Sequence, residues 1–216
     1  MAARVVCVSH ATGAGGREVA RAVAEGLGFV FLDEEIVARA AAREGLDPAV
    51  VADAEQRKSF LRRLLEDWGG PSMGLDQGGV GALLLTPEGG VDPSGAPAER
   101  YRTLIKDVIH ETAERGDAVI CSHAASFALA GRDDVLRVFV TASPWTRARR
   151  VAEERGLERE EAEKIVRFDD GARADYLKRF YEVDAELPTH YDVVVSTDAL
   201  DAAQAAGVVL AAAGLR

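Results

Sequence analysis

The sequence is poor in the residues that build disulfide frameworks and metal centres. It has only two cysteines, Cys7 and Cys121, and four histidines, and their spacing matches no metal-ligand pattern. We also find no Ser/His/Asp arrangement suited to nucleophilic catalysis. Both cysteines fall in short apolar runs that we expect to be buried strands. We therefore expect reduced thiols that fill the core of a cytoplasmic protein, and no metal site.

The chain also lacks a long apolar segment and an excess of basic residues. No run approaches the length that crosses a membrane, and glycines and charges occur within the first twenty residues, so we expect neither a membrane anchor nor a signal segment. The formal net charge of −10 argues against broad nucleic-acid binding, which needs a basic face. The net charge does not exclude a nucleotide ligand, because a nucleotide site needs positive charge only locally. The arginines concentrate in residues 147–179.

Residues 5–21 hold the most informative pattern. Residues 5–8 form an apolar, β-branched run typical of a buried parallel strand, residues 12–16 have almost no side chain, and helical spacing begins at Arg17. Strand, glycine loop and helix together surround a phosphate with backbone N–H groups and a helix N-terminus. The residues expected around it are Thr12, Gly13, Ala14, Gly15, Gly16, Arg17 and Glu18. The alternative is a tight β–α turn that only needed glycine.

This loop departs from the common phosphate-binding pattern GxxxxGKS/T. After Gly15 come Gly16 and Arg17 in place of a lysine and a hydroxyl residue, and His10 stands where the first glycine would be. Arg17 can supply the missing cation, although a guanidinium is a longer, planar donor rather than a point charge. No hydroxyl follows Gly16 to hold magnesium from this loop.

Apolar runs and helical spacings alternate along the rest of the chain. We expect strands at residues 29–32, 118–121, 135–141 and 191–196, and helices over residues 101–115, 158–181 and 200–210. Further helices are expected to begin at Glu34, at Asp47 and at Ser143-Pro144, where an N-cap residue precedes proline. We expect residues 69–97, rich in glycine and proline, to form a long loop that is either a functional lid or disordered. Strands separated by helices specify one α/β domain over residues 1–216, with a parallel sheet.

Polar residues lie where ligands of parallel sheets bind, at the carboxyl ends of strands. Asp33 follows the second expected strand and Ser122-His123 the third. On the helix over residues 158–181, Arg167, Asp170 and Arg173 are spaced to lie near one another. They form either a solvated face with an ordinary Asp–Arg pair, or a mobile arm whose arginines reach polyphosphate while Asp170 orients Arg173.

Three blocks of sequence together resemble the cytidylate kinase-like family of P-loop nucleoside monophosphate kinases: GAGGREVARAVAEGLGFVFLDEEIV, VLRVFVTASPWTRARR and GLEREEAEKIVRFDDGARADY. The resemblance covers most of the chain except residues 69–97, and a Gly-Gly-Arg loop is typical of one branch of that family. It implies a P-loop NTPase fold: a five-stranded parallel sheet flanked by helices. It also implies a helical acceptor-binding insert within residues 33–97 and a lid over residues 145–180.

The resemblance further implies an activity, the ATP-dependent phosphorylation of a nucleoside monophosphate, with CMP or dCMP as the first candidates for the acceptor. It also implies that Mg²⁺ is held mainly through the nucleotide. By position, the catalytic cations that the resemblance implies are Arg17, Arg150, Arg167 and Arg173. The acceptor-binding residues that it implies are Asp33, Ser122, His123 and Asp170, and Arg147 lines the lid. Such proteins commonly carry Gly-Arg where this chain has Ser122-His123. The alternatives are a nucleotide-binding sensor without turnover and a kinase for another small acceptor. Small-molecule nucleotides are the expected partners.

Overall fold

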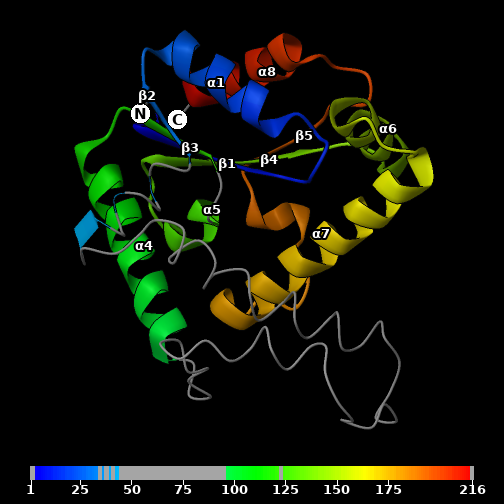
Figure 1. Ribbon diagram of the computed structural model, residues 1–216. Helices are drawn as coiled ribbons and strands as arrows, with labels where there is room; N and C mark the ends of the chain where they lie inside the picture. The colour runs from blue at the N-terminus through cyan, green and yellow to red at the C-terminus, as the bar shows by residue number, and fades with distance from the viewer. Residues whose placement is uncertain are drawn as a thin grey trace, which may run out of the picture.

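A computed structural model describes residues 3–33, 36, 39, 42, 43, 96–121 and 124–214. Five strands form one parallel sheet in the order β2-β3-β1-β4-β5 (Figure 1). The strands are β1 (Val5–His10), β2 (Val30–Leu32), β3 (Ala118–Cys121), β4 (Val135–Thr141) and β5 (Val193–Ser196). The order places β1 at the centre, so the loop that follows β1 leaves the middle of the sheet.

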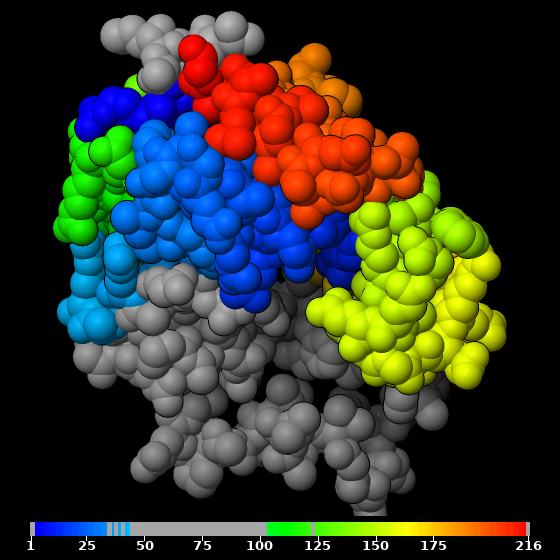
Figure 2. All heavy atoms as spheres, turned by 90° about the horizontal axis from the view of Figure 1, so that it is seen from above, coloured from blue at the N-terminus to red at the C-terminus, as the bar shows by residue number. Residues whose placement is uncertain are grey.

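Helices cover both faces of this sheet (Figure 1). On one face α1 (Gly16–Leu27) lies beside α8 (Ala202–Gly214), and Figure 2 shows these two helices side by side from above. The other face carries α4 (Ala96–Arg115) and the short α5 (Ala125–Ala128). After β4, α6 (Pro144–Arg155) and α7 (Arg159–Tyr181) pack against each other, and the short 3₁₀ helix η2 (Pro188–His190) precedes β5.

The alternation of side chains along β1 divides the core into two layers. Val6 and Val8 join the apolar cluster under α1 and α8, whereas Val5 and Cys7 join the cluster under α4. These four side chains are almost fully buried, and burying a valine contributes about 1.5–3 kcal/mol relative to leaving it exposed. β1 therefore supports the loop after it from a rigid position.

Most predicted elements of the described chain are confirmed. α6 begins at Pro144, and the side chain of Ser143 accepts a hydrogen bond from the N–H of Thr146, as the N-cap prediction required. Cys7 and Cys121 are free and buried, and burial raises the pKa of each thiol to about 12, so both fill the core.

Several predicted boundaries are wrong. β2 begins at Val30 rather than at residue 29, and β5 begins at Val193 rather than at Tyr191, whose ring stacks on Phe139. α8 spans Ala202–Gly214 rather than residues 200–210. The loop predicted to reach residue 97 ends earlier, since α4 begins at Ala96. The helix predicted from Asp47, most of the insert and residues 122–123 lie outside the described residues. Within the part of the chain that the structure describes, no helix is long and apolar enough to span a membrane.

Candidate functional site

The chain turns from β1 into α1 through a loop that depends on two glycines. Gly13 (φ 77°) and Gly15 (φ 72°) adopt the left-handed backbone conformation that favours glycine. Gly15 is the N-cap of α1 and offers no side chain to cap it. The first N–H groups of an α-helix have no partner within the helix, so those at the start of α1 face the space ahead of it. The predicted succession of strand, glycine loop and helix is confirmed, and its geometry suits an anion.

Three successive carbonyl groups of this loop each accept a hydrogen bond from a side chain of α6 or of the turn after β5. The pairs are Arg147 Nη1 to Thr12 O (3.4 Å), Arg150 Nη1 to Gly13 O (3.4 Å) and Thr197 Oγ1 to Ala14 O (2.8 Å). In a trans peptide the N–H points away from the carbonyl. The N–H groups of Gly13 and Gly15 therefore face away from these donors, toward the open side of the loop.

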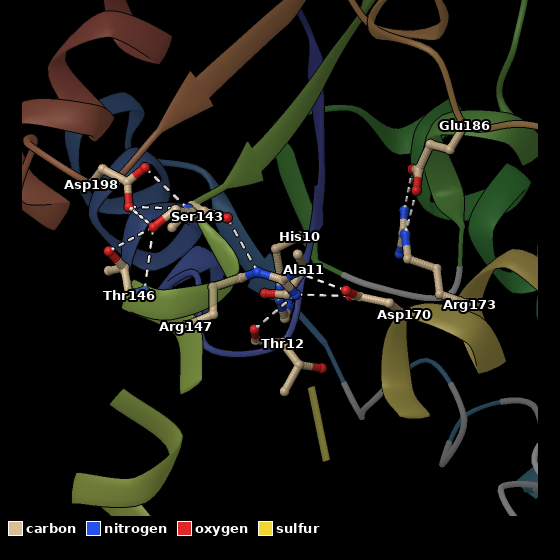
Figure 3. Close-up of polar contacts among 11 residues, drawn as sticks. His10, Ala11, Thr12, Ser143, Thr146, Arg147, Asp170, Arg173, Glu186 and Asp198 are labelled. Atoms are coloured by element: carbon tan, nitrogen blue, oxygen red, sulfur yellow. Dashed lines mark hydrogen bonds and ion pairs between the residues drawn. The ribbon is translucent and has the colours of Figure 1, made fainter. Parts of the chain in front are cut away.

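Arg147 is the buried centre of these contacts (Figure 3). Its Nε donates to the carbonyl of Ala142 (3.2 Å), and its Nη1 and Nη2 donate to the two carboxylate oxygens of Asp170 (2.8 and 2.7 Å). The side chain of Arg147 is 7% exposed and that of Asp170 is 43% exposed. Arg147 thus connects the loop, the end of β4 and α7.

The predicted pairing of Asp170 with Arg173 is wrong. Asp170 accepts from Arg147 of α6, and Arg173 donates instead to both carboxylate oxygens of Glu186 (2.8 and 2.6 Å), as Figure 3 shows. Spacing along α7 allowed the Asp170–Arg173 pair, but the packing of α6 on α7 brings a second guanidinium closer to Asp170. Arg173 also lies 3.3 Å from the hydroxyl of Tyr191, which donates to Glu186.

The Arg173–Glu186 pair is largely enclosed, with side chains 24% and 18% exposed. Burial by itself raises the pKa of Glu186, but the hydrogen bonds and charge of Arg173 outweigh it and hold that pKa below its ordinary value. Arg173 therefore binds the segment after α7 in this structure.

Arg17 and Asp33 are brought together by the structure although sequence analysis assigned them to different substrates. Arg17 Nε lies 2.8 Å from Asp33 Oδ2, with the Arg17 side chain 46% exposed and that of Asp33 11% exposed. Arg17 stands in the first turn of α1, and Asp33 directly follows β2. The most accessible cation of the loop is thus held at the end of β2.

The two other predicted cations have different surroundings. Arg150 donates to the side chain (2.8 Å) and the carbonyl (2.7 Å) of Thr197, besides its contact with the loop. Arg167 is 66% exposed and lies 4.0 Å from Glu163, one turn earlier on α7. Arg167 is therefore not joined to the loop by the contacts of this structure. Ser122 and His123 lie outside the described residues.

Sequence analysis missed the turn after β5. Thr197 is buried and holds the loop, as described, while Asp198 accepts hydrogen bonds from the backbone N–H (3.0 Å) and the hydroxyl (2.9 Å) of Ser143 (Figure 3). The hydroxyl of Thr146, together with these two bonds from Ser143, lowers the pKa of Asp198. The available signal was position alone, since both residues follow a strand at the carboxyl edge of the sheet.

The comparisons with known proteins identify the family. The sequence model of the cytidylate kinase-like family matches residues 5–199. The chain belongs to the cytidylate kinase-like family. Among curated proteins, none is similar enough in sequence to count as a relative.

Solved structures show that this member of the cytidylate kinase-like family has the P-loop kinase fold. It is similar to an uncharacterized protein from Eubacterium ventriosum, with a TM-score of 0.67 and 15% identity, covering 98% of this chain and 99% of that one. It is also similar to the shikimate kinase from Bacteroides thetaiotaomicron, with a TM-score of 0.51 and 16% identity, covering 96% of each chain. The predicted five-stranded parallel P-loop fold is confirmed.

Proposed function

We propose that this protein is a nucleotide kinase that transfers the γ-phosphoryl group of ATP to a nucleoside monophosphate, with CMP and dCMP the first acceptors to test. One observation carries the proposal. In a chain of a kinase-like family, the carbonyls of Thr12, Gly13 and Ala14 are held by side chains of α6 and of the turn after β5, so the N–H groups of Gly13 and Gly15 point the other way. This arrangement supports binding of the donor's phosphates.

The charges around the loop also fit a polyphosphate ligand. Arg17, Arg147 and Arg173 each lie against a carboxylate. These pairs hold cations near the loop of a protein whose net charge is −10. Arg17 is the most exposed of the three, with its side chain 46% exposed, so a phosphate can reach its guanidinium from solvent. Arg17 is therefore the cation that we assign to the donor phosphates.

The reaction needs no nucleophile from the protein. An ionised phosphate oxygen of the acceptor attacks the γ-phosphorus, the bond from that phosphorus to the β–γ bridging oxygen breaks, and ADP leaves with the electron pair. The protein contributes positioning and neutralises the charge that develops on the transferred group. An acceptor that is already ionised requires no general base.

Magnesium has no dedicated protein site in this arrangement. No hydroxyl follows Gly16, and no three His, Cys, Asp or Glu side chains gather into a metal-binding group among the described residues. Magnesium favours phosphate oxygens and water over a full set of protein ligands. We therefore expect Mg²⁺ to arrive with ATP and to remain bound mainly through the nucleotide.

We propose that residues 145–180 act as the lid. α6 and α7 share an apolar contact through Ala148, Val151, Ala162 and Val166, and α6 contacts the loop through Arg147 and Arg150. Such a pair can close over bound nucleotides and exclude water during transfer. Amide hydrogen exchange tests this: exchange within residues 145–180 should slow when ATP and the acceptor are bound together. Equal exchange with and without ligands would make α6 and α7 a fixed structural pair.

A sensor that binds nucleotide without turnover is the second candidate. The observation that favours it is the loop itself, which has glycine at position 16 and no lysine. Coupled-enzyme turnover with ATP and a panel of CMP, dCMP, UMP, AMP and shikimate, beside calorimetric titration with ATP, separates the candidates. Shikimate is included because one similar structure is a shikimate kinase. Turnover with CMP or dCMP supports the proposal, and ATP binding without transfer to any acceptor replaces it with the sensor. An absence of ATP binding refutes both.

A kinase of small nucleotides also suits the cytoplasm, the compartment that we propose for this protein. Its two free thiols are buried, and raised pKa values keep them protonated and unreactive.

A further inference from the structure

His10 and Gly16, the two residues at which the loop departs most from the common phosphate-binding pattern, lie directly against each other. A Cβ built on Gly16 would stand 2.5 Å from Cγ and 2.9 Å from Cδ2 of His10, and closer still to the Cβ of His10. Atoms of His10 are the three nearest to that position. The side chain of His10 therefore occupies the space into which any side chain at position 16 would project.

The backbone at Gly16 would otherwise accept another residue. Gly16 is the first residue of α1 and is not among the glycines with positive φ, whereas Gly13 and Gly15 are. Its requirement for glycine therefore arises from close approach and not from backbone conformation. Replacing His10 by alanine would leave the Cβ at position 10 in place, and an added Cβ at position 16 would still clash with it. Only glycine at position 10 would open the space.

His10 is not suited to replace the lysine as a cation. Its side chain is half-buried, and burial lowers its pKa; the nearby Arg173 lowers it as well, against smaller opposing effects of Asp33 and Glu18. Its Nδ1 lies 3.5 Å from the carbonyl of Ala11, whose hydrogen bond also opposes the shift. The imidazole is thus neutral near pH 7, and the loop needs its positive charge from another residue.

We propose that His10 is a positioning residue of the phosphate loop: it excludes a side chain at position 16 and so transfers the loop's cationic role to Arg17. This inference rests on the proposed function for the role of Arg17, but not for the steric relation between His10 and Gly16. In the common pattern glycine stands at the position of His10 and lysine at the position of Gly16. Here both positions differ together, and the two residues are in contact.

Thermal denaturation of four variants tests the steric relation without any nucleotide. Gly16→Ala should lower the melting temperature by roughly 3–10 °C, because overpacking of this kind destabilises a domain of this size by that amount. In the Gly16→Ala background, His10→Gly should recover most of the loss and His10→Ala should not. Gly207→Ala is the matched control, since Gly207 lies in α8 with nothing within 4 Å of an added Cβ. Its melting temperature should stay equal or rise.

Steady-state kinetics test the transfer of the cationic role. Arg17→Ala should lower kcat by about 10²-fold or more in the wild-type loop, as loss of one cation from a transferred phosphoryl group does. In a His10→Gly/Gly16→Lys background, which restores the first glycine and the lysine of the common pattern, the same change should cost about tenfold or less. An equal loss in both backgrounds would overturn the proposed role of His10.

The two experiments separate failure of this inference from failure of the proposed function. If the wild-type protein transfers no phosphate, the proposed function falls, while the melting temperatures still decide the steric relation. If Gly16→Ala melts like the wild type, or if His10→Ala rescues it as well as His10→Gly does, the inference is wrong even for an active kinase.

Discussion

The guanidinium of Arg17 lies 2.8 Å from the carboxylate of Asp33, so the first turn of α1 is joined to the end of β2. The pair connects the loop that we assign to the donor with a carboxylate that we assign to the acceptor side. The Arg17 side chain is 46% exposed and that of Asp33 is 11% exposed, so the cation is open to solvent while its partner is largely buried. We expect Arg17 to exchange Asp33 for phosphate when ATP binds.

Substitution of Arg17 provides the first test of this assignment. Arg17→Ala should lower kcat by about 10²-fold or more, since the transferred phosphoryl group loses a cation in a site with little water. Arg17→Lys should restore part of the activity, because an ammonium cannot reproduce the planar guanidinium fork. Arg149→Gln is the control: Arg149 is exposed and pairs with Glu153 on the same helix. Unchanged activity of Arg17→Ala would remove Arg17 from the mechanism.

A second prediction concerns the two requirements at Gly13. This glycine has φ 77°, and an added Cβ would stand 2.6 Å from the carbonyl oxygen of Arg147. Gly13→Ala should therefore lower the free energy of unfolding by about 2–5 kcal/mol, the sum of backbone strain and overpacking. It should also weaken the stabilisation by ATP. Gly28→Ala is the matched control, because Gly28 has φ 69° and nothing lies within 4 Å of its added Cβ.

Gly28→Ala should cost only the strain of the left-handed conformation, about 1–2 kcal/mol. Urea denaturation measures both variants, and ATP titration followed by thermal denaturation measures the effect on binding. Equal losses of unfolding free energy in the two variants would show that the close approach of Gly13 to α6 adds nothing to the cost of Gly13→Ala.

A third prediction follows from the partner of Asp170. Asp170→Asn should leave the buried Arg147 guanidinium without an ionised partner. Breaking a fully buried pair costs about 3–5 kcal/mol, and since Asp170 is 43% exposed we expect a smaller loss, roughly 1–3 kcal/mol. Urea denaturation gives this value, with Glu163→Gln as the surface control.

Amide hydrogen exchange then distinguishes an effect of Asp170 on the loop after β1 from an effect on the stability of the whole protein. Release of Arg147 should speed exchange at Gly13 and Gly15 more than in β1, because Arg147 holds the Thr12 carbonyl. Exchange that rises equally throughout the protein would contradict a specific link from Asp170 through Arg147 to the loop.

The fourth prediction is a pH dependence of stability from Glu186. Its pKa in the folded protein lies below its ordinary value of 4.5, because the attraction of Arg173 exceeds the effect of burial. A carboxyl whose folded-state pKa is lowered stabilises the protein above its unfolded pKa, and the contribution disappears as pH falls through the folded value. Wild-type stability should therefore fall below about pH 4.5 more steeply than that of Glu186→Gln.

Guanidinium denaturation of both proteins at several pH values between neutral and acid measures this difference. Other carboxylates titrate in the same range, among them Asp134 and Asp198, whose pKa values are also lowered. The comparison between wild type and Glu186→Gln removes their shared effect. Parallel curves for the two proteins would show that the Arg173–Glu186 pair does not change the proton affinity of Glu186.

Much of the fold could be predicted from the sequence because its signals are local. The apolar run at residues 5–8 identified a buried strand, and the Ser143-Pro144 pair identified the start of α6, which the structure places there. The glycines of residues 12–16 predicted a loop between a strand and a helix, and Gly13 and Gly15 adopt the left-handed conformation there. Each of these signals depends on neighbours within a few residues, whose backbone preferences persist in the folded protein.

The ion-pair partners of the charged residues could be identified only from the tertiary structure. Sequence spacing offered Arg173 to Asp170, yet Asp170 pairs with Arg147, 23 residues earlier, and Arg173 pairs with Glu186. Thr197 holds the loop from a distance of 183 residues along the chain. Periodicity tells which residues share a face of one helix, but not which other helix or turn will pack on that face.

The sequence alone determined that a glycine loop joins a buried strand to a helix, and that Gly16 and Arg17 stand where a lysine and a hydroxyl residue were expected. Only the tertiary structure decided why position 16 is glycine, because the space that its side chain would need belongs to His10. The physical reason is the range of the interaction: backbone conformation is set by each residue and its neighbours, whereas exclusion of one side chain by another depends on how strand and helix pack.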